Sequence, residues 1–175
     1  MKKITLILLL SLLGFSAGAQ KSIALLDKVE GHRVNFHYTY SLSQKGEPFK
    51  AVTDGDVVLE GNDYLLEGLG LKVISDGTTR WTLDEAAGEA VVETVEKEDL
   101  FTNPALFIGS YKRYLDKIKV NSQGNDSLDV TLTLDEETKA RFQLKDIVYG
   151  ELQGKSDFSV DEKSLGEKIL VTDLR

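Results

Sequence analysis

The sequence has no cysteine and, among its 175 residues, only two prolines, two histidines, one tryptophan and one methionine. Without cysteine no disulfide holds the chain together, and a zinc site would have to be built mostly from carboxylates, which is an unusual ligand set. His32 and His37 are an odd number of positions apart, which places them on opposite faces of a strand. Phosphate-binding, dinucleotide-binding, G-x-S-x-G and S-x-x-K motifs are absent from the sequence. We therefore predict no metal site, no cofactor and no catalytic residue.

The first 19 residues have the three parts of a secretory signal peptide. Lys2 and Lys3 form a basic start, residues 4–13 form an apolar run that is short for a membrane span, and residues 17–19 (AGA) form a cleavage site. No cysteine follows that site, so the exported chain carries no acylated cysteine. We expect residues 1–19 to be removed and residues 20–175 to form one soluble periplasmic domain.

Acidic residues outnumber basic ones throughout the expected domain. Without Lys2 and Lys3, 19 basic residues remain against 29 acidic ones, a formal charge of −10. Such a charge argues against nucleic acids and anionic lipid surfaces as partners. It suits a soluble, monomeric carrier that offers an apolar site, although solubility alone explains it equally well.

Alternating apolar and polar residues predict a β-rich fold. The pattern is clearest over residues 33–42, where Val34, Phe36, Tyr38 and Tyr40 share one face. Turn signals at residues 53–55, 76–77 and 84–88 separate further expected strands, with Asp76-Gly77 matching a two-residue hairpin in which both residues have positive φ. About ten strands separated by such signals predict one antiparallel sandwich or barrel. These further strands are expected over residues 47–52, 56–60, 64–66, 71–75, 79–83, 89–95 and 128–134 and around Phe142, Leu144, Ile147, Tyr149, Phe158, Val160, Ile169 and Val171.

Two short helices interrupt the strand pattern. The first is expected over residues 22–31, begun by Ser22 and ended by Gly31. The second is expected within residues 100–114, with Asn103 as its cap and Pro104 in its first turn.

The aromatic residues of the expected strands and helices have two interpretations. They fill the interior of a closed barrel, or they line a cavity in an incomplete barrel that a helix closes.

Residues 73–92, VISDGTTRWTLDEAAGEAVV, carry a family likeness. The stretch resembles the signature hairpin of the outer-membrane lipoprotein carrier family (LolA-like proteins). Residues 33–40 (RVNFHYTY), the Asn-Pro-Ala-Leu helix start at 103–106 and the ending DFSVDEKSLGEKILVTDLR extend the likeness, the ending being similar to that of Bacteroidota-type members. The resemblance implies a half-open antiparallel β-barrel closed by a helical lid.

The function implied by the resemblance is transport rather than catalysis. Members act as periplasmic chaperones that shelter the acyl chains of lipoproteins between an inner-membrane release complex and an outer-membrane acceptor. In well-studied members an arginine on a strand ahead of the tryptophan hairpin holds the lid shut. Residues 56–73 contain no arginine, so the likeness leaves lid control in this chain unassigned.

The apolar face of the alternating strands supplies the expected cavity lining, and the second helix supplies the lid contacts. A register error of one residue on the tryptophan strand would exchange every inward and outward residue on it. The expected lining is Phe36, Tyr38, Tyr40, Leu59, Leu66, Val73, Trp81, Leu83, Val130, Leu132 and Phe142, with Leu106, Phe107 and Tyr111 as lid contacts.

Two other functions are compatible with the sequence. One is a lipid- or lipoprotein-sensing regulatory domain built on the same fold. The other is a secreted hydrolase that uses two turn carboxylates about 5 to 9 Å apart. The acidic residues near the expected turns are Asp54, Asp56, Asp63, Asp76 and Asp84, and in turns such residues usually serve their own backbone.

Overall fold

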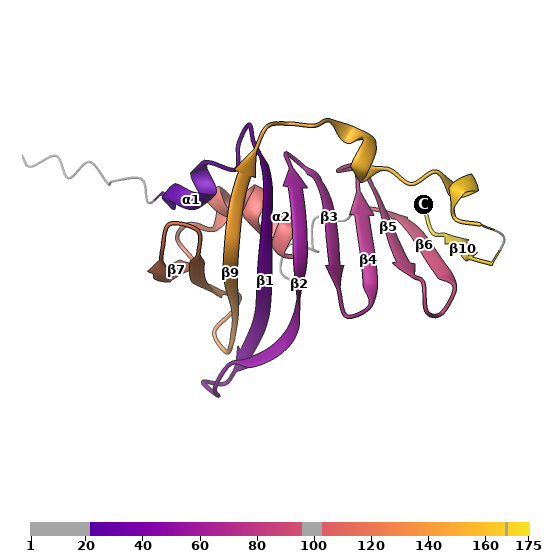
Figure 1. Cartoon of the computed structure of the whole chain (residues 1–175). Coiled ribbons are helices and arrows are strands. Elements are labelled where there is room, and N and C mark those ends of the chain that lie inside the picture. Colours follow the sequence, from indigo (N-terminus) through magenta and orange to yellow (C-terminus); the bar gives the residue numbers. More distant parts are fainter. Residues whose placement is uncertain (1–21, 96–102, 167) are drawn as a thin grey trace, which may run out of the picture.

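The computed structural model describes residues 22–95, 103–166 and 168–175, so the expected signal peptide (1–19) lies outside the described residues. The chain forms one ten-stranded sheet in the order β10-β6-β5-β4-β3-β2-β1-β9-β8-β7 (Figure 1). β7 and β10 lie at opposite ends of this order, so the sheet is open. The prediction of a mainly β fold with short helices and an unclosed sheet is confirmed. The strands are β1 (Arg33–Gln44), β2 (Lys50–Glu60), β3 (Asp63–Gly68), β4 (Leu71–Ser75), β5 (Thr79–Asp84), β6 (Glu89–Thr94), β7 (Ile118–Gln123), β8 (Leu128–Thr133), β9 (Thr138–Gly150) and β10 (Leu170–Asp173).

The strand pairs are antiparallel except at one edge of the sheet. β10 runs parallel to β6, with Val171 opposite Ala90. The expectation of a purely antiparallel sheet is therefore wrong at this edge. After β9 the chain crosses one face of the sheet and reaches β6 at the distant edge, where it forms β10 (Figure 1). This crossover sets the parallel direction of β10.

β2 runs without interruption through the predicted turn at residues 53–55. Gly55 lies opposite Gly68 on β3, and a Cβ atom at Gly55 would sit 2.0 Å from the carbonyl oxygen of Glu67. The glycine is therefore needed for the close approach of two strands rather than for a turn. The sequence pattern did not distinguish these two uses of glycine.

The connection from β4 to β5 is also longer than the predicted two-residue hairpin. Only Gly77 has a positive φ, of 81°. The Oδ1 atom of Asp76 accepts hydrogen bonds from the backbone N–H groups of Thr78 (2.9 Å) and Thr79 (2.8 Å). Because Ser75 pairs with Arg80, the loop spans four residues and Asp76 stabilises it through its side chain.

The two helices lie on the same side of the sheet. α1 (Ala24–Asp27) is shorter than expected, whereas α2 (Pro104–Ser110) begins where predicted. The Oδ1 atom of Asn103 accepts from the backbone N–H groups of Ala105 (2.9 Å) and Leu106 (3.3 Å), which satisfies two donors of the first turn. A 3-10 helix, η2 (Tyr111–Tyr114), follows directly. We call the side of the sheet that these helices cover the helical face.

The opposite side of the sheet, the tail face, is crossed by residues 151–166 and 168–175, which we call the C-terminal segment (Figure 1). It contains two 3-10 helices, η3 (Lys155–Phe158) and η4 (Glu162–Ser164), before β10. Its apolar residues pack on Trp81 and its neighbours and form a second core, separate from the core beneath the helices. The sheet therefore buries apolar side chains on both of its faces.

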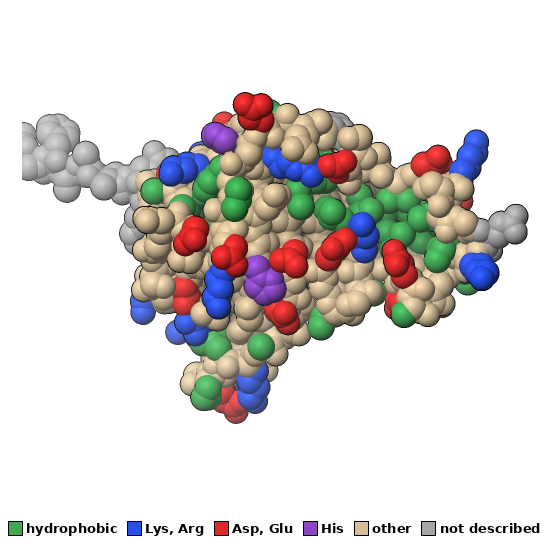
Figure 2. All heavy atoms as spheres, viewed as in Figure 1, with side chains coloured by type: hydrophobic (Ala, Val, Ile, Leu, Met, Phe, Trp, Pro, Cys, Tyr) green, Lys and Arg blue, Asp and Glu red, His purple; other side chains and the backbone are tan. Residues whose placement is uncertain are grey.

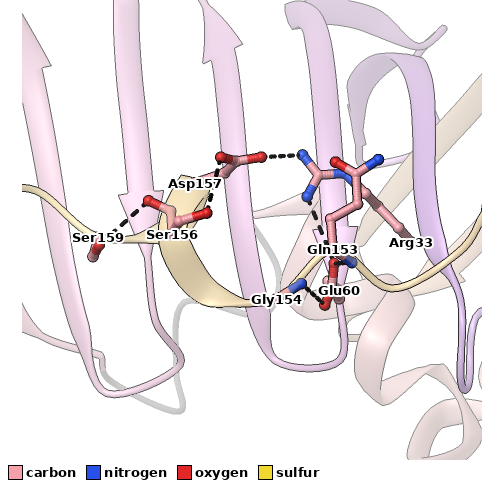
Figure 3. A network of polar contacts seen from close by, with 7 residues as sticks. All are labelled: Arg33, Glu60, Gln153, Gly154, Ser156, Asp157 and Ser159. Carbon is pink, nitrogen blue, oxygen red and sulfur yellow. Dashed lines mark hydrogen bonds and ion pairs between the residues drawn. The ribbon is translucent and has the colours of Figure 1, made fainter.

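A polar network fixes the start of the C-terminal segment to β1 and β2 (Figure 3). The Glu60 carboxylate accepts hydrogen bonds from the backbone N–H groups of Gln153 (3.1 Å) and Gly154 (2.9 Å), and the first of these is the largest cause of its lowered pKa. The Arg33 guanidinium donates to Asp157 at 2.8 Å and lies 5.2 Å from the ring centroid of Phe158. Phe158, a residue of this segment, is fully buried. Both polar and apolar contacts therefore hold the segment on the sheet.

Candidate functional site

The strand register shows which side chains share the helical face. Val57, Leu66, Val73 and Thr82 are cross-strand neighbours on β2, β3, β4 and β5. Val57 in turn pairs with Phe36 on β1, so this row continues the face that the helices cover. Beyond α2 the row carries on over β4 to β6, where its side chains are only half-buried.

A pocket of about 290 Å³ opens on this part of the helical face, beside the start of α2. Its floor comes from β3 and β4, and its walls come from β1, β2, β5, β6 and the residue that caps α2. The lining residues are Tyr38, Thr53, Leu66, Gly68, Leu69, Leu71, Val73, Arg80, Thr82, Glu93 and Asn103.

The floor of the pocket is mainly apolar. Leu66 and Val73 lie side by side as a cross-strand pair, and Leu71 lies opposite Gly68 two pairs further along. A Cβ atom at Gly68 would lie 3.3 Å from the Tyr38 hydroxyl and 2.6 Å from the carbonyl oxygen of Asp54. The glycine thus leaves room for the Tyr38 side chain at the edge of the pocket.

One wall of the pocket carries a partly buried ion pair. The Nε and Nη2 atoms of Arg80 lie 3.1 Å and 3.0 Å from the Oε1 atom of Glu93. Arg80 and Glu93 are also a cross-strand pair of β5 and β6, so the sheet register holds them together. The buried Tyr64 hydroxyl lies near Arg80. Burial raises the pKa of Tyr64, and the positive charge of Arg80 partly offsets this increase. This wall therefore presents charges of both signs that compensate each other.

Beneath α2 the helical face is filled by side chains of the protein itself. The Phe107 ring of α2 stacks on Phe142 of β9, with centroids 4.4 Å apart and planes 6° from parallel. Tyr40 packs against the same Phe142 ring at 5.1 Å. The structure places most of the predicted lining and lid residues in this packed core, namely Phe36, Tyr40, Leu59, Val130, Leu132, Phe142, Phe107 and Tyr111, with Leu106 at its margin.

Three members of the predicted lining, Tyr38, Leu66 and Val73, do meet at the pocket. Two others, Trp81 and Leu83, lie on the tail face, so the prediction that they share a face with Val73 is wrong. Val73 pairs with Thr82, whereas Trp81 pairs with Ile74. Since neighbouring residues on a strand point to opposite faces, Trp81 must point away from the pocket. The predicted lining was displaced by one residue on this strand.

The sequence interpretation missed the polar wall of the pocket. On β5 the pocket is lined by Thr82 and not by Trp81. The predicted lining includes neither Arg80 nor Glu93. The signal was present, because Arg80, Thr82 and Asp84 alternate with Trp81 and Leu83. In a hairpin this alternation places Arg80 and Thr82 together on the face opposite Trp81.

A hydrogen bond links the two helical elements near a second pocket. The Tyr111 hydroxyl donates to the Asp27 carboxylate, and burial together with this carboxylate raises the pKa of Tyr111. Lys112 lies 3.4 Å from Glu30 and adds an ion pair across the same junction. The second pocket, of about 260 Å³, is lined by Leu26, Val29, Glu30, Gly61, Asn62, Ile108, Gly109, Tyr111 and Lys112.

The carboxylates considered for hydrolysis are spread over β2, β3, the end of β5 and the loop between β4 and β5. Asp76 and Asp84 accept backbone N–H groups within their own turns, while Asp54 and Asp56 belong to β2. Asp56 lies 3.1 Å from Nδ1 of His37 on the tail face. Within the ranges that the structure describes, no group of three or more His, Cys, Asp or Glu residues is placed to hold a metal ion.

No helix in the described parts of the chain is long and apolar enough to cross a membrane. Neither a protein-family model nor a curated protein sequence matches the chain. Solved structures do match it, and one is the crystal structure of a LolA superfamily protein from Nitrosomonas europaea. That match has a TM-score of 0.44 and 8% sequence identity, and covers 79% of this chain and 97% of the other.

Proposed function

We propose that the protein is a periplasmic carrier that shelters the acyl chains of lipoproteins during their transfer from the inner to the outer membrane. One observation carries this proposal: half-buried apolar side chains, Leu66, Leu71 and Val73, form the floor of an open pocket on the helical face. The resemblance of residues 73–92 to the carrier hairpin supports the same function.

The pocket suits a ligand that must be both held and released. Each methylene group removed from water contributes about 0.8 kcal/mol, so even a partly sheltered chain gains several kcal/mol. The apolar floor lies at an open surface rather than inside a sealed core, which leaves a path for the chain to leave. A carrier between two membranes needs this combination of moderate affinity and access.

The composition of the chain supports a carrier that stays in solution. The expected mature domain has a formal charge of −10. Such a charge disfavours lasting adsorption to anionic lipid surfaces. Contact with a membrane would then occur through specific partners, which we propose to be an inner-membrane release complex and an outer-membrane acceptor.

The proposal is tested by identifying what the protein carries. The protein is exported with its own leader, purified from the periplasm, and its bound molecules are identified by mass spectrometry. A Leu66→Glu variant places a charge on the pocket floor, and a Val148→Glu variant places the same charge on an exposed site of β9, where Val148 is 59% exposed. Acylated lipoproteins should co-purify with the unaltered protein and with Val148→Glu, and be lost from Leu66→Glu.

Two results would contradict the carrier function. Recovery of free lipids without lipoproteins would favour the sensing or lipid-binding alternative. Equal recovery of lipoproteins with Leu66→Glu, at unchanged folding by circular dichroism, would show that the pocket is not the binding site.

A further inference from the structure

We infer that two copies of the protein associate through β10, whose outer edge pairs antiparallel with the β10 strand of a second copy. The inference goes beyond the proposed function and does not depend on what the protein carries. It follows from a difference between the two edges of the sheet.

The β7 edge is protected against pairing with another chain. The register between β7 and β8 shifts between Val120 and Ser122, so that Asn121 has no partner on β8. Lys119 lies next to this irregularity, and most side chains of the strand are exposed and polar. An irregular register and a lysine are two of the means by which proteins prevent pairing between sheet edges.

The β10 edge has neither form of protection. The strand contains no lysine or proline, and its register with β6 is regular. Leu170 and Leu174 are 67% and 63% exposed, and the one charged residue, Asp173, is neutralised by Arg175 at 2.7 Å. Among the described residues, no strand pairs with the outer side of β10 (Figure 1). An unprotected edge with exposed leucines favours pairing with a further strand.

The hydrogen bonds to β6 show which backbone groups of β10 remain for a partner. The N–H groups of Leu170 and Leu174 donate, each at 2.8 Å, to carbonyl oxygens of β6 and of the residue before it. Successive residues of a strand point their backbone groups to alternate sides. The N–H and C=O groups of Val171 and Asp173 therefore point to the outer edge.

These groups determine the register of the proposed pairing. In an antiparallel pair, two opposite residues exchange both hydrogen bonds only if the backbone groups of both point toward the partner strand. When Thr172 lies opposite Thr172 of the second copy, each Val171 meets the Asp173 of the other copy, and the outward groups of both residues are used. The same register places each Leu170 opposite the Leu174 of the other copy. A shift by two residues in either direction separates these leucines.

The pairing ends at two copies and is weak. It uses the unprotected edge of each copy, so only the two protected β7 edges remain. The contact involves residues 170–174 of each copy, whereas a stable interface has roughly 20–30 residues a side. Each copy also has an expected formal charge of −10, which opposes association. We expect a Kd on the order of 100 µM. The expectation of a monomeric carrier, which rests on charge alone, then applies only below this concentration.

Sedimentation of the purified exported protein between about 10 µM and about 1 mM tests the association. The dimer fraction should rise with protein concentration, and it should rise further with added NaCl, which screens the repulsion between the copies. Leu170→Lys places a charge on the β10 edge and should raise the Kd at least about tenfold. Val120→Lys adds the same charge to the β7 edge, where Val120 is 42% exposed, and should leave the Kd within about twofold.

A cysteine at the centre of the contact tests the register, because the sequence contains no cysteine of its own. In Thr172→Cys the two Cα atoms should lie about 4.5 Å apart, a distance that a disulfide spans, so oxidised glutathione should link the copies. In Leu170→Cys the two cysteines should be about 13 Å apart along the strands, too far for a disulfide.

Three results would overturn the inference. The first is a protein that stays monomeric at about 1 mM. The second is a dimer that Leu170→Lys weakens no more than Val120→Lys does. The third is a dimer in which Leu170→Cys is linked as readily as Thr172→Cys, because the two strands would then not pair in this register.

Discussion

The two halves of the sheet bury opposite faces. In the first half, which comprises β1, β2, β9 and β8, the core lies on the helical face and is filled by α1 and α2. In the second half, which comprises β4, β5 and β6, the core lies on the tail face and is filled by the C-terminal segment. Figure 2 shows the tail face, where charged residues and histidine lie over the first half and hydrophobic side chains gather over the second.

This difference explains where on the sheet a pocket is available. In the first half the helical face is needed for stability, so its residues cannot also hold a ligand without a rearrangement of α2. In the second half the tail face supplies the stability, and the helical face is left to form the pocket. Strand β3 lies between the halves and contributes to both, with Tyr64 in the first core and Leu65 against the second.

The largest expected effect comes from emptying the core of the first half. Phe142 is fully buried and stacks on Phe107. Phe142→Ala should lower the free energy of unfolding by about 3–5 kcal/mol, because it removes a large side chain from a tightly packed site. Urea denaturation followed by circular dichroism measures the change. A loss below about 1 kcal/mol would show that α2 does not pack firmly on this half.

A slightly smaller effect is expected from the second half. Phe158 is fully buried beneath the C-terminal segment, and Phe158→Ala should lower the free energy of unfolding by about 3 kcal/mol. The only tryptophan, Trp81, lines the same small pocket as Phe158, so its fluorescence should shift to longer wavelength as water reaches it. Phe142→Ala should leave the native emission of Trp81 unchanged. An equal shift in both variants would contradict the separation of the two cores.

The pocket itself should contribute little to stability. Val73 is half-buried on the pocket floor, so Val73→Ala should lower the free energy of unfolding by about 1 kcal/mol or less. Loss of this contact should weaken binding of the methyl ester of cis-parinaric acid, a fluorescent acyl-chain probe, by about two- to fivefold, measured by fluorescence titration. Weakened binding together with a loss of several kcal/mol would show that the pocket floor belongs to a structural core after all.

The smallest effect is electrostatic and again differs between the halves. Burial alone would raise the pKa of Asp129, but hydrogen bonds from Arg141 (2.9 Å) and Asn121 (2.8 Å) outweigh it and the pKa is lowered. A carboxylate with a folded pKa below its unfolded value of about 3.9 contributes stability above that pH and loses it as the pH falls through the folded pKa. Asp129→Asn should therefore lower stability at pH 7 and flatten the loss of stability below about pH 4.

Asp173 provides the matched comparison in the second half. The Arg175 side chain lowers the pKa of Asp173 to about 2, a larger shift than most. The pair is exposed to solvent, which screens it, so Asp173→Asn should change the stability at pH 7 very little. Thermal melting of both variants between pH 2 and pH 7 makes the comparison. A smaller loss of stability at low pH in Asp173→Asn than in Asp129→Asn would contradict this expectation.

Much of this fold could be predicted because its strands obey simple rules. The alternation of Val34, Phe36, Tyr38 and Tyr40 fixed both the existence and the inner face of β1. The Asn103-Pro104 pair located the start of α2, since each residue serves a helix start for a separate physical reason. Strand β7 was not predicted, because as an exposed edge strand it has almost no apolar residues to reveal it.

The site was harder to predict, because it depends on long-range register. Whether Val73 or Ile74 faces the helices is decided by the pairing of β3 with β2, and nothing within the tryptophan hairpin records it. The hairpin has apolar residues on both faces, since the C-terminal segment covers one of them. Alternation of apolar and polar residues identifies the buried face of a strand only where its other face is polar. This condition fails for β4 and β6.

The central position of β1 has a consequence for the timing of folding. β1 lies between β2 and β9, so Tyr40 pairs with Phe142 from the far end of the domain. The core beneath the helices thus cannot close until β9 has been made, and the second core waits for β10, the last strand of the chain. Contacts so distant in sequence slow folding. A chain built in this way completes neither core before its C-terminal strands are available.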